Sequence, residues 1–305
     1  MPHQPAALTT RPARPGIPLG VTVVLVAGVL ATAVLAGCAP RHLGATGTPG
    51  AEQLHVQVLA TLSHDTTMYT EGLEIHHGVL YESSGLVGQS RIRASALPVS
   101  SALQGRPTRG LAGLEEHPSA TTTLREAALP APLFSEGITV AGDRLWQLTW
   151  TSGIAIERDP VTLAQRRQVN YQGEGWGLCY DGHRLVMSDG SSRLTFRNPV
   201  SFAPSGQLEV RLEGEPVRAL NELECAGGVI WANVFPTDRI VRINPRTGEV
   251  SGVVDASGLL KAPPQSTEDV LNGIAAIPGT DEFLITGKRW PLLFRVRFVP
   301  STPRS

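Results

Sequence analysis

Five segments of the chain begin with an acidic, amide or aromatic residue followed closely by small and apolar residues. Their first residues are Glu71, Glu136, Trp176, Glu222 and Asn272, with Glu174 and Asn221 beside them. A carboxylate packed among indoles and other acids is poorly hydrated and meets like charge, and both effects raise its pKa toward neutrality. Such a group can accept and return a proton at neutral pH, so the pattern predicts general acid–base chemistry.

Each segment continues through a Gly- or Asp-containing turn into a second apolar strand. Because that strand runs antiparallel to the first, its end returns to the same face. The returning ends carry Glu82, Gln147, Trp150, Asp189, Asn233, Lys288 and Trp290. We therefore expect one face of the protein to collect acids, amides and indoles.

These segments belong to one repeated unit. A third segment with alternating side chains follows each pair of strands, starting at Ser90, Gly153, Arg193, Arg239 and Leu293. Repeats of roughly 40 to 50 residues with three or four short antiparallel strands are typical of β-propeller blades. Five copies predict an all-β, five-bladed β-propeller over residues 56–300. A β-sandwich, the other architecture considered, does not require a recurring start because rotation about an axis does not relate its strands.

The first repeat is longer than the others because it contains residues 97–132, which are rich in Ala, Pro, Thr and Gly. We interpret this segment as a loop insertion, although it has room for a blade strand. In a propeller the five repeat starts lie at one mouth of the central channel, which is where a shared site is expected.

Plainer interpretations of the same side chains stay open. A glutamate before glycine is commonly a solvated turn residue, and a tryptophan in a strand is commonly part of the core. Asn221, Asn233 and Asn272 could instead bind the backbone of neighbouring blades. A shared site is favoured because polar or aromatic residues recur at the same position of all five repeats.

Composition and spacing exclude several functions. Charged residues make up 17% of the 305 residues and the formal net charge is −1, so no nucleic-acid partner is expected. The three cysteines and eight histidines show no Cys-x-x-Cys or His-x-x-x-His spacing, so no metal or other cofactor is expected. Ser90 is not in a nucleophile elbow, and the glycine-rich residues 173–177 precede neither a lysine nor a helix.

The N-terminal segment has the layout of an export signal. Arg11 and Arg14 precede an uncharged apolar stretch that ends in Leu-Ala-Gly-Cys at residues 35–38, which resembles a bacterial lipobox. This predicts a lipoprotein signal peptide over residues 1–37, lipidation of Cys38 and a flexible tether over residues 38–55. We expect the protein to be exported and lipid-anchored to a bacterial membrane, with the folded domain outside the cytoplasm. A membrane-spanning anchor of about 20 residues is the alternative.

Two further cysteines, Cys179 and Cys225, would then lie in an oxidising compartment, where a disulfide can persist. Each lies within an apolar strand, where a free cysteine commonly acts as a small buried hydrophobic residue. We therefore favour two unpaired thiols.

A set of motifs in order along the chain resembles one known family. The motifs are HDTTMYTEGL from His64, LYESSGLVGQSRIR from Leu80, FSEGIT from Phe134, LWQLTW from Leu145, GEGWGL from Gly173, MSDGSS from Met187, LNELE from Leu220, WANVFPTDRIVRINPRTG from Trp231, LNGIA from Leu271 and TGKRWPLLF from Thr286. Together they resemble the plant and bacterial type of glutaminyl-peptide cyclotransferase, a five-bladed propeller family. The chain departs from the family in having Glu71 for the usual Gln, Tyr69 for Phe, and a longer segment over residues 96–132.

The resemblance implies cyclisation of an N-terminal glutamine of a peptide or protein to pyroglutamate, with release of ammonia and without zinc. It places the acid–base role on Glu82, with Glu136 as the second choice. The resemblance makes five residues candidates to bind the side-chain amide or the oxyanion, namely Gln147, Asn221, Asn233, Asn272 and Lys288. Trp150, Trp176 and Trp290 would exclude water, and Glu71, Glu174, Asp189 and Glu222 would line the pocket.

Two other functions remain as alternatives. A non-catalytic propeller would bind a protein or glycan at the channel mouth. A propeller lactonase or hydrolase would hold a central metal ion, for which Glu71, Glu136, Asn221 and Asn272 are the candidate ligands.

Overall fold

The computed structural model describes residues 50–97, 121–261 and 266–301, which all belong to one compact unit, Thr48–Ser305. The expected signal peptide, Cys38 and residues 98–120 of the expected insertion lie outside the described residues. Within the described part of the chain there are strands and turns, and no helix is long and apolar enough to cross a membrane.

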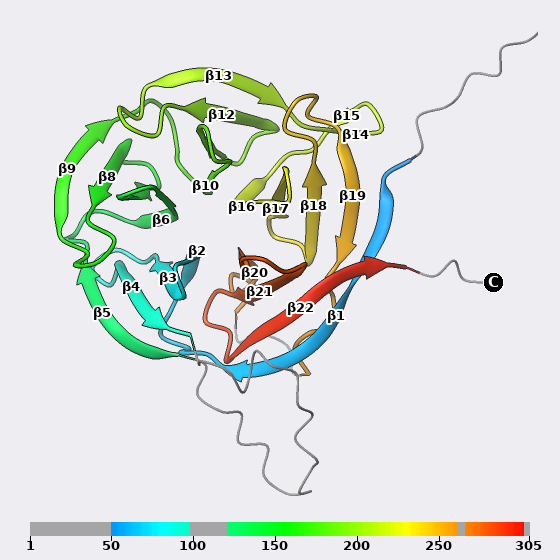
Figure 1. Ribbon diagram of the computed structural model, residues 1–305, viewed down its shortest axis with the longest axis horizontal. Helices are drawn as coiled ribbons and strands as arrows, with labels where there is room; N and C mark the ends of the chain where they lie inside the picture. The colour runs from blue at the N-terminus through cyan, green and yellow to red at the C-terminus, as the bar shows by residue number, and fades with distance from the viewer. Residues whose placement is uncertain (1–49, 98–120, 262–265, 302–305) are drawn as a thin grey trace, which may run out of the picture. The chain divides into compact units, whose positions relative to one another are not determined.

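The strands form five four-stranded antiparallel blades around a common axis (Figure 1). From the inside outward, the blades are β2 (Thr70–His76), β3 (Val79–Ser84), β4 (Arg91–Ala96) and β5 (Thr122–Ala128); β6 (Ser135–Ala141), β7 (Arg144–Thr149), β8 (Ile154–Arg158) and β9 (Gln165–Asn170); β10 (Leu178–Tyr180), β11 (Leu185–Met187), β12 (Arg193–Arg197) and β13 (Pro204–Glu209); β16 (Leu220–Ala226), β17 (Val229–Val234), β18 (Arg239–Ile243) and β19 (Val250–Asp255); and β20 (Leu271–Ala276), β21 (Glu282–Gly287), β22 (Leu292–Pro300) and β1 (Glu52–Ser63). A small hairpin of β14 (Arg211–Leu212) and β15 (Glu215–Pro216) precedes the fourth blade. The inner strands contact one another in a closed ring, so the prediction of a five-bladed propeller is confirmed.

The ring is closed by the first strand of the chain. β1 pairs antiparallel with β22 and completes the fifth blade, and its first residues also pair parallel with β19 of the fourth. Because β1 and β22, the first and last strands described, pair in one sheet, the fifth blade closes the ring. β1 begins at Glu52, so the boundary expected between tether and propeller at residue 55 was a few residues too late.

Burial follows the position of a strand in its blade. The inner strand β6 is buried along its whole length because neighbouring blades cover both of its faces, whereas the outer strands β5 and β9 are mostly exposed. β5 lies inside residues 97–132, so treating that whole segment as an insertion was wrong. β5 is a polar outer strand and lacks the apolar pattern by which the inner strands were recognised.

Cys179 and Cys225 form a disulfide, so the expectation of two free thiols was wrong. Cys179 lies on β10 and Cys225 on β16, and these inner strands of successive blades pack side by side. The two Cα atoms are 5.4 Å apart, a normal separation for a disulfide. The bond therefore links the third and fourth blades near the axis.

Removing this disulfide is expected to destabilise the protein. The bond closes a loop with a sequence separation of 46 residues, and cross-links of this size typically contribute about 2–4 kcal/mol. A Cys179→Ala, Cys225→Ala double variant should lose that amount of unfolding free energy in urea titrations. A loss below about 1 kcal/mol would contradict a bonded pair in the folded protein.

Candidate active site

The recurring polar starts of the inner strands are β-bulges. The pairing register shifts between Thr70 and Gly72, between Ser135 and Ile138, between Leu220 and Leu223, and between Leu271 and Ile274. A bulge leaves a residue outside the ladder and re-aims its side chain. The polar residues skipped in these four blades are Glu71, Glu136, Asn221, Glu222 and Asn272, so the same irregularity sets the direction of five of the predicted side chains.

The glycines that accompany these polar residues allow the inner strands to approach closely. A Cβ atom added at Gly72 would lie 2.8 Å from the backbone nitrogen of Ile138, and one at Gly137 would lie 2.6 Å from the carbonyl oxygen of Trp176. A Cβ at Gly177 would meet the Asn221 carbonyl oxygen at 2.1 Å. Glycine is therefore required at these contacts between blades.

Glu71 and Lys288 form a buried ion pair at this end of the axis. Lys288 Nζ lies 2.7 Å from Glu71 Oε1 and 2.6 Å from Oε2, and Asn272 Nδ2 donates to Oε2 at 3.1 Å. The Glu71 side chain is 1% exposed and the Lys288 side chain 7%. Burial would lower the pKa of Lys288, but the charges of Glu71 and Glu136 outweigh it and keep the ammonium protonated.

Glu136 lies against this pair and shares a hydrogen bond with Glu71. Burial raises the pKa of Glu71 to about 7, although Lys288 acts against the shift. Burial also raises the pKa of Glu136 well above its ordinary value, and the Glu71 charge adds to the effect. The two carboxyl groups titrate as a pair, and the Lys288 ammonium stabilises the charged form of that pair.

Two predicted tryptophans form one side of the site. Trp150 Nε1 and Trp176 Nε1 both donate to Oε2 of Glu174, at 2.8 and 2.9 Å. The carboxylate thus fixes both indole rings, and its charge also contributes to the raised pKa of Glu136. Trp150 remains 41% exposed, so this indole is accessible from solvent.

Three further aromatic residues, Tyr69, Phe134 and Phe235, were missed from the sequence. The Phe134 ring centroid lies 6.3 Å from that of Tyr69 and 5.6 Å from that of Trp150, and Phe235 lies 5.9 Å from Trp176. Lys288 Nζ lies 4.7 Å from the centroid of Tyr69 and 5.7 Å from that of Phe235. Tyr69 and Phe134 both stand two residues before a bulged glutamate, in Tyr-Thr-Glu-Gly and Phe-Ser-Glu-Gly, and this shared spacing was the available signal.

The amides at this end of the axis are only partly satisfied. Asn272 Nδ2 also donates to the Thr70 carbonyl, and Asn233 Oδ1 accepts from the Gly273 N–H, so the expected backbone links are present. Among the described residues, Asn221 Oδ1, Asn233 Nδ2 and Asn272 Oδ1 are buried without a hydrogen-bond partner. Leaving such atoms unpaired is costly, so they favour a polar ligand that supplies both donors and an acceptor.

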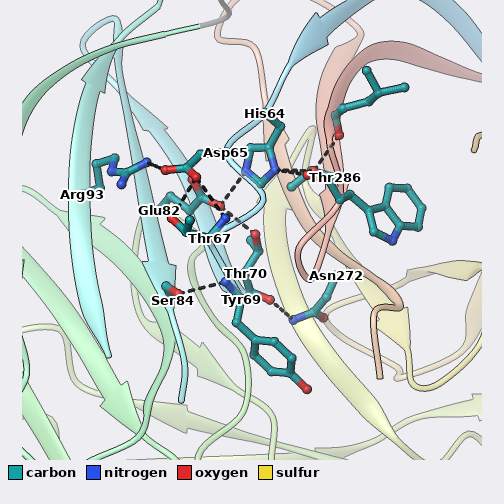
Figure 2. A network of polar contacts seen from close by, with 12 residues as sticks. His64, Asp65, Thr67, Tyr69, Thr70, Glu82, Ser84, Arg93, Asn272 and Thr286 are labelled. Atoms are coloured by element: carbon teal, nitrogen blue, oxygen red, sulfur yellow. Dashed lines mark hydrogen bonds and ion pairs between the residues drawn. The ribbon is translucent and has the colours of Figure 1, made fainter. Parts of the chain in front are cut away.

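Glu82, the first choice for acid–base chemistry, is committed to other partners (Figure 2). Its Oε1 lies 2.9 Å from His64 Nε2 and accepts from Thr70 Oγ1 at 2.6 Å. Burial alone would raise the pKa of Glu82, but the His64 charge and these hydrogen bonds lower it below its ordinary value. The lowered pKa and the ion pair with His64 make Glu82 a poor proton shuttle, so the geometry favours Glu136, the second choice.

Gln147 and Glu222 do not face a ligand either. Gln147 Nε2 donates to Ser135 Oγ and its Oε1 accepts from Arg158 Nε, both at 2.7 Å, so its amide is used inside the second blade. Glu222 accepts one backbone N–H of β2 and one of β20, at 3.2 and 2.8 Å. These contacts give both residues a structural role between or within blades.

Trp290 was placed wrongly by the sequence pattern, whereas the pocket role expected of Asp189 stays a prediction. Trp290 is 4% exposed, packs in the core of the fifth blade and donates its Nε1–H to the Asp269 carbonyl at 2.8 Å. Asp189 closes a turn by accepting from the N–H and Oγ–H of Ser191. Trp290 is therefore not available as a pocket wall.

The arrangement does not match the metal shell considered above. Glu71 is neutralised by the Lys288 ammonium, which occupies both of its oxygens. In residues 50–97, 121–261 and 266–301, no three His, Cys, Asp or Glu side chains are placed to hold one metal ion.

The fold and the site together define a five-bladed propeller protein with a buried cluster of two glutamates and a lysine at one end of its axis. The chain belongs to the glutamine cyclotransferase family, whose model matches residues 29–298. It is 33% identical over 257 residues to a glutaminyl-peptide cyclotransferase of Arabidopsis thaliana, an alignment that covers 82% of this chain and 73% of the relative. The crystal structure of Myxococcus xanthus glutaminyl cyclase superimposes with a TM-score of 0.69 and 37% identity, over 83% of this chain and all of that one. The family resemblance is confirmed.

Proposed function

We propose that this protein is a glutaminyl-peptide cyclotransferase that converts the N-terminal glutamine of peptides or proteins to pyroglutamate and releases ammonia. Family membership and the two named relatives support the activity. The observation that carries the proposal is the buried Glu71–Glu136 pair, in which burial raises the pKa of Glu71 to about 7 and the pKa of Glu136 well above its ordinary value, beside a charged lysine.

The reaction needs a group that both accepts and returns a proton. The neutral α-amine of the substrate attacks the side-chain amide carbon, its proton passes to Glu136, and Glu136 returns a proton to the departing nitrogen, which leaves as ammonia. Its raised pKa suits both directions of transfer, because general acid–base catalysis is most effective when the pKa lies near the working pH.

The remaining polar groups suit the charge that develops during this reaction. The attacked carbonyl oxygen becomes negative, and the Lys288 ammonium and unpaired amide donor of Asn233 are the nearby groups that can stabilise it. The free carbonyl oxygens of Asn221 and Asn272 can accept from the substrate amine or amide. Trp150 and Trp176 would cover the bound residue and restrict the access of water.

The direct test is ammonia release by the purified protein from dipeptides that begin with Gln, together with mass spectrometry of the cyclised product. Turnover that is unchanged by EDTA is expected. Turnover that EDTA abolishes and one equivalent of Ca²⁺ restores would favour the metal-dependent hydrolase. No turnover on any Gln-initiated peptide by folded protein would favour the binding propeller.

We also propose that the protein is exported and anchored to a membrane through lipid on Cys38. The charge and hydropathy pattern of residues 1–38 supports this, and the Cys179–Cys225 disulfide is of the kind that persists in oxidising compartments. In a bacterial host, an alkyne fatty acid should label the wild-type chain in the membrane fraction, and a Cys38→Ser variant should lose the label. Equal labelling of both would contradict the assignment.

A further inference from the structure

The segment between β1 and β2 crosses from the fifth blade to the first and holds the turn that carries Lys288. The His64 N–H donates to the Pro291 carbonyl at 2.8 Å, and the Arg289 N–H donates to the Met68 carbonyl at 2.8 Å. His64 Nδ1 lies 2.7 Å from the Trp290 carbonyl oxygen. The turn that presents Lys288 is therefore held at the three residues that follow the lysine.

The other ring nitrogen of His64 connects this turn to the first blade (Figure 2). His64 Nε2 meets Glu82 Oε1, which also accepts from Thr70 Oγ1. Thr70 directly precedes Glu71, and its carbonyl accepts from Asn272 Nδ2 at 3.0 Å. One chain of hydrogen bonds thus joins the backbone that carries Lys288 to the backbone that carries Glu71.

The hydrogen-bond partners determine the protonation state of His64. A backbone carbonyl can only accept, and an ionised Glu82 can only accept, so both ring nitrogens must donate. The ring is then an imidazolium, and the pair is a buried ion pair with both side chains 7% exposed. A neutral imidazole would leave one of the two acceptors without its donor.

The surrounding charges agree with this state. Burial would lower the pKa of His64, but the charge and hydrogen bond of Glu82, the Trp290 carbonyl and the Asp65 charge outweigh it and raise the pKa above its ordinary value. Arg93 is neutralised by Asp65 at 2.8 Å and by Glu126 at 2.9 Å. From the fifth blade, Thr286 presents a neutral hydroxyl, and the neighbouring Lys288 and Arg289 direct their charges to Glu71 and Asp269.

We propose that His64, held as an imidazolium by Glu82, is a positioning residue that sets Lys288 against Glu71 for the cyclisation reaction. The inference rests on the proposed function, because Lys288 serves that reaction. Loss of the His64 proton breaks one link in the chain of hydrogen bonds between the turn and the first blade and lets the ammonium shift, and misplacement of a catalytic group by about 1 Å can cost about 100-fold in rate.

The test compares wild type with Glu82→Gln, which keeps the size and an acceptor oxygen of the side chain but removes its charge. Without that charge, burial leaves the His64 pKa below its wild-type value. The ratio of variant to wild-type kcat should then be about 0.1 or lower at pH 8 and recover toward 1 near pH 5.5, with KM altered less than kcat. His183→Ala, an exposed histidine outside the network, is the matched control and should follow the wild-type profile.

Nitrogen NMR of the His64 ring provides a readout that is independent of turnover. Both ring nitrogens should be protonated in wild type at pH 8, and one should be deprotonated in Glu82→Gln. A neutral His64 in wild type at pH 7, or a kcat ratio that does not change with pH, overturns the inference. Absence of cyclase activity in wild type with the ring doubly protonated would refute the proposed function and leave the ion pair established.

Discussion

Replacement of Glu136 by Gln is expected to lower kcat for cyclisation of Gln-initiated peptides by about 10²- to 10⁴-fold, the usual contribution of a positioned acid–base group. Gln has nearly the same shape as Glu and can keep the contact with Glu71, but it cannot accept the amine proton. KM should change little, because the substrate contacts assigned to the asparagines and indoles remain. Steady-state kinetics of ammonia release measure both constants.

The control for this experiment is Glu249→Gln, which makes the same chemical change at an exposed position away from the site. It should leave kcat within about twofold of wild type, since surface substitutions are close to neutral. If Glu136→Gln keeps more than a third of wild-type kcat, Glu136 is not the proton shuttle. If instead Glu82→Gln is inactive at every pH, the role returns to Glu82.

Much of the fold was predictable because the feature that repeats in the sequence has a local cause. A polar or aromatic residue recurs at the start of each inner strand, and in four of the five blades it lies at a bulge, so five copies marked five blades. The start of β1 and the strand β5 were not recognised, since outer strands are polar and their partners lie far away in the chain. The disulfide was missed because it depends on how β10 and β16 align across two adjacent blades, and the sequence around each cysteine does not show this alignment.

The candidate site was predicted only in part, and the errors at Glu82 and Gln147 share a geometric origin. Residues on the second strand of a blade were all expected at the mouth. Lys288 and Trp150, which lie just past the ends of β21 and β7, do reach the site. Glu82 and Gln147 lie inside β3 and β7, where neighbouring strands and loops enclose their side chains. In these blades, position relative to the end of the second strand separates the site residues from the structural ones.

Replacement of Lys288 by Met is expected to reduce both stability and activity. It leaves the Glu71 carboxylate buried without its cation, and breaking a buried pair in this way typically costs about 3–5 kcal/mol. It also removes the positive charge beside the developing oxyanion, which should lower kcat by about 10²- to 10³-fold. Urea denaturation at several pH values and ammonia-release kinetics measure the two effects.

The pKa of Glu71 determines how the stability loss of Lys288→Met varies with pH. The folded pKa of Glu71 is raised from 4.5 to about 7, so its protonated form contributes stability that is complete below pH 4.5 and is lost as the pH rises through 7. Without Lys288 the pKa rises further, so the stability deficit of Lys288→Met should be largest above pH 8 and shrink toward pH 5. A deficit that is constant over this range would show that lost packing, and not the unpaired carboxylate, is its cause.

A double variant separates charge burial from catalysis at this position. Glu71→Gln combined with Lys288→Met removes both charges, and replacing a buried pair by neutral side chains is often neutral or stabilising. Its unfolding free energy should return to within about 1 kcal/mol of wild type at pH 8, while kcat stays about 100-fold low because no cation faces the oxyanion. If activity returned together with stability, Lys288 would act only to hold Glu71 in the fold. If neither returned, the aromatic residues around the lysine, Tyr69 and Phe235, would depend on its ammonium for their packing.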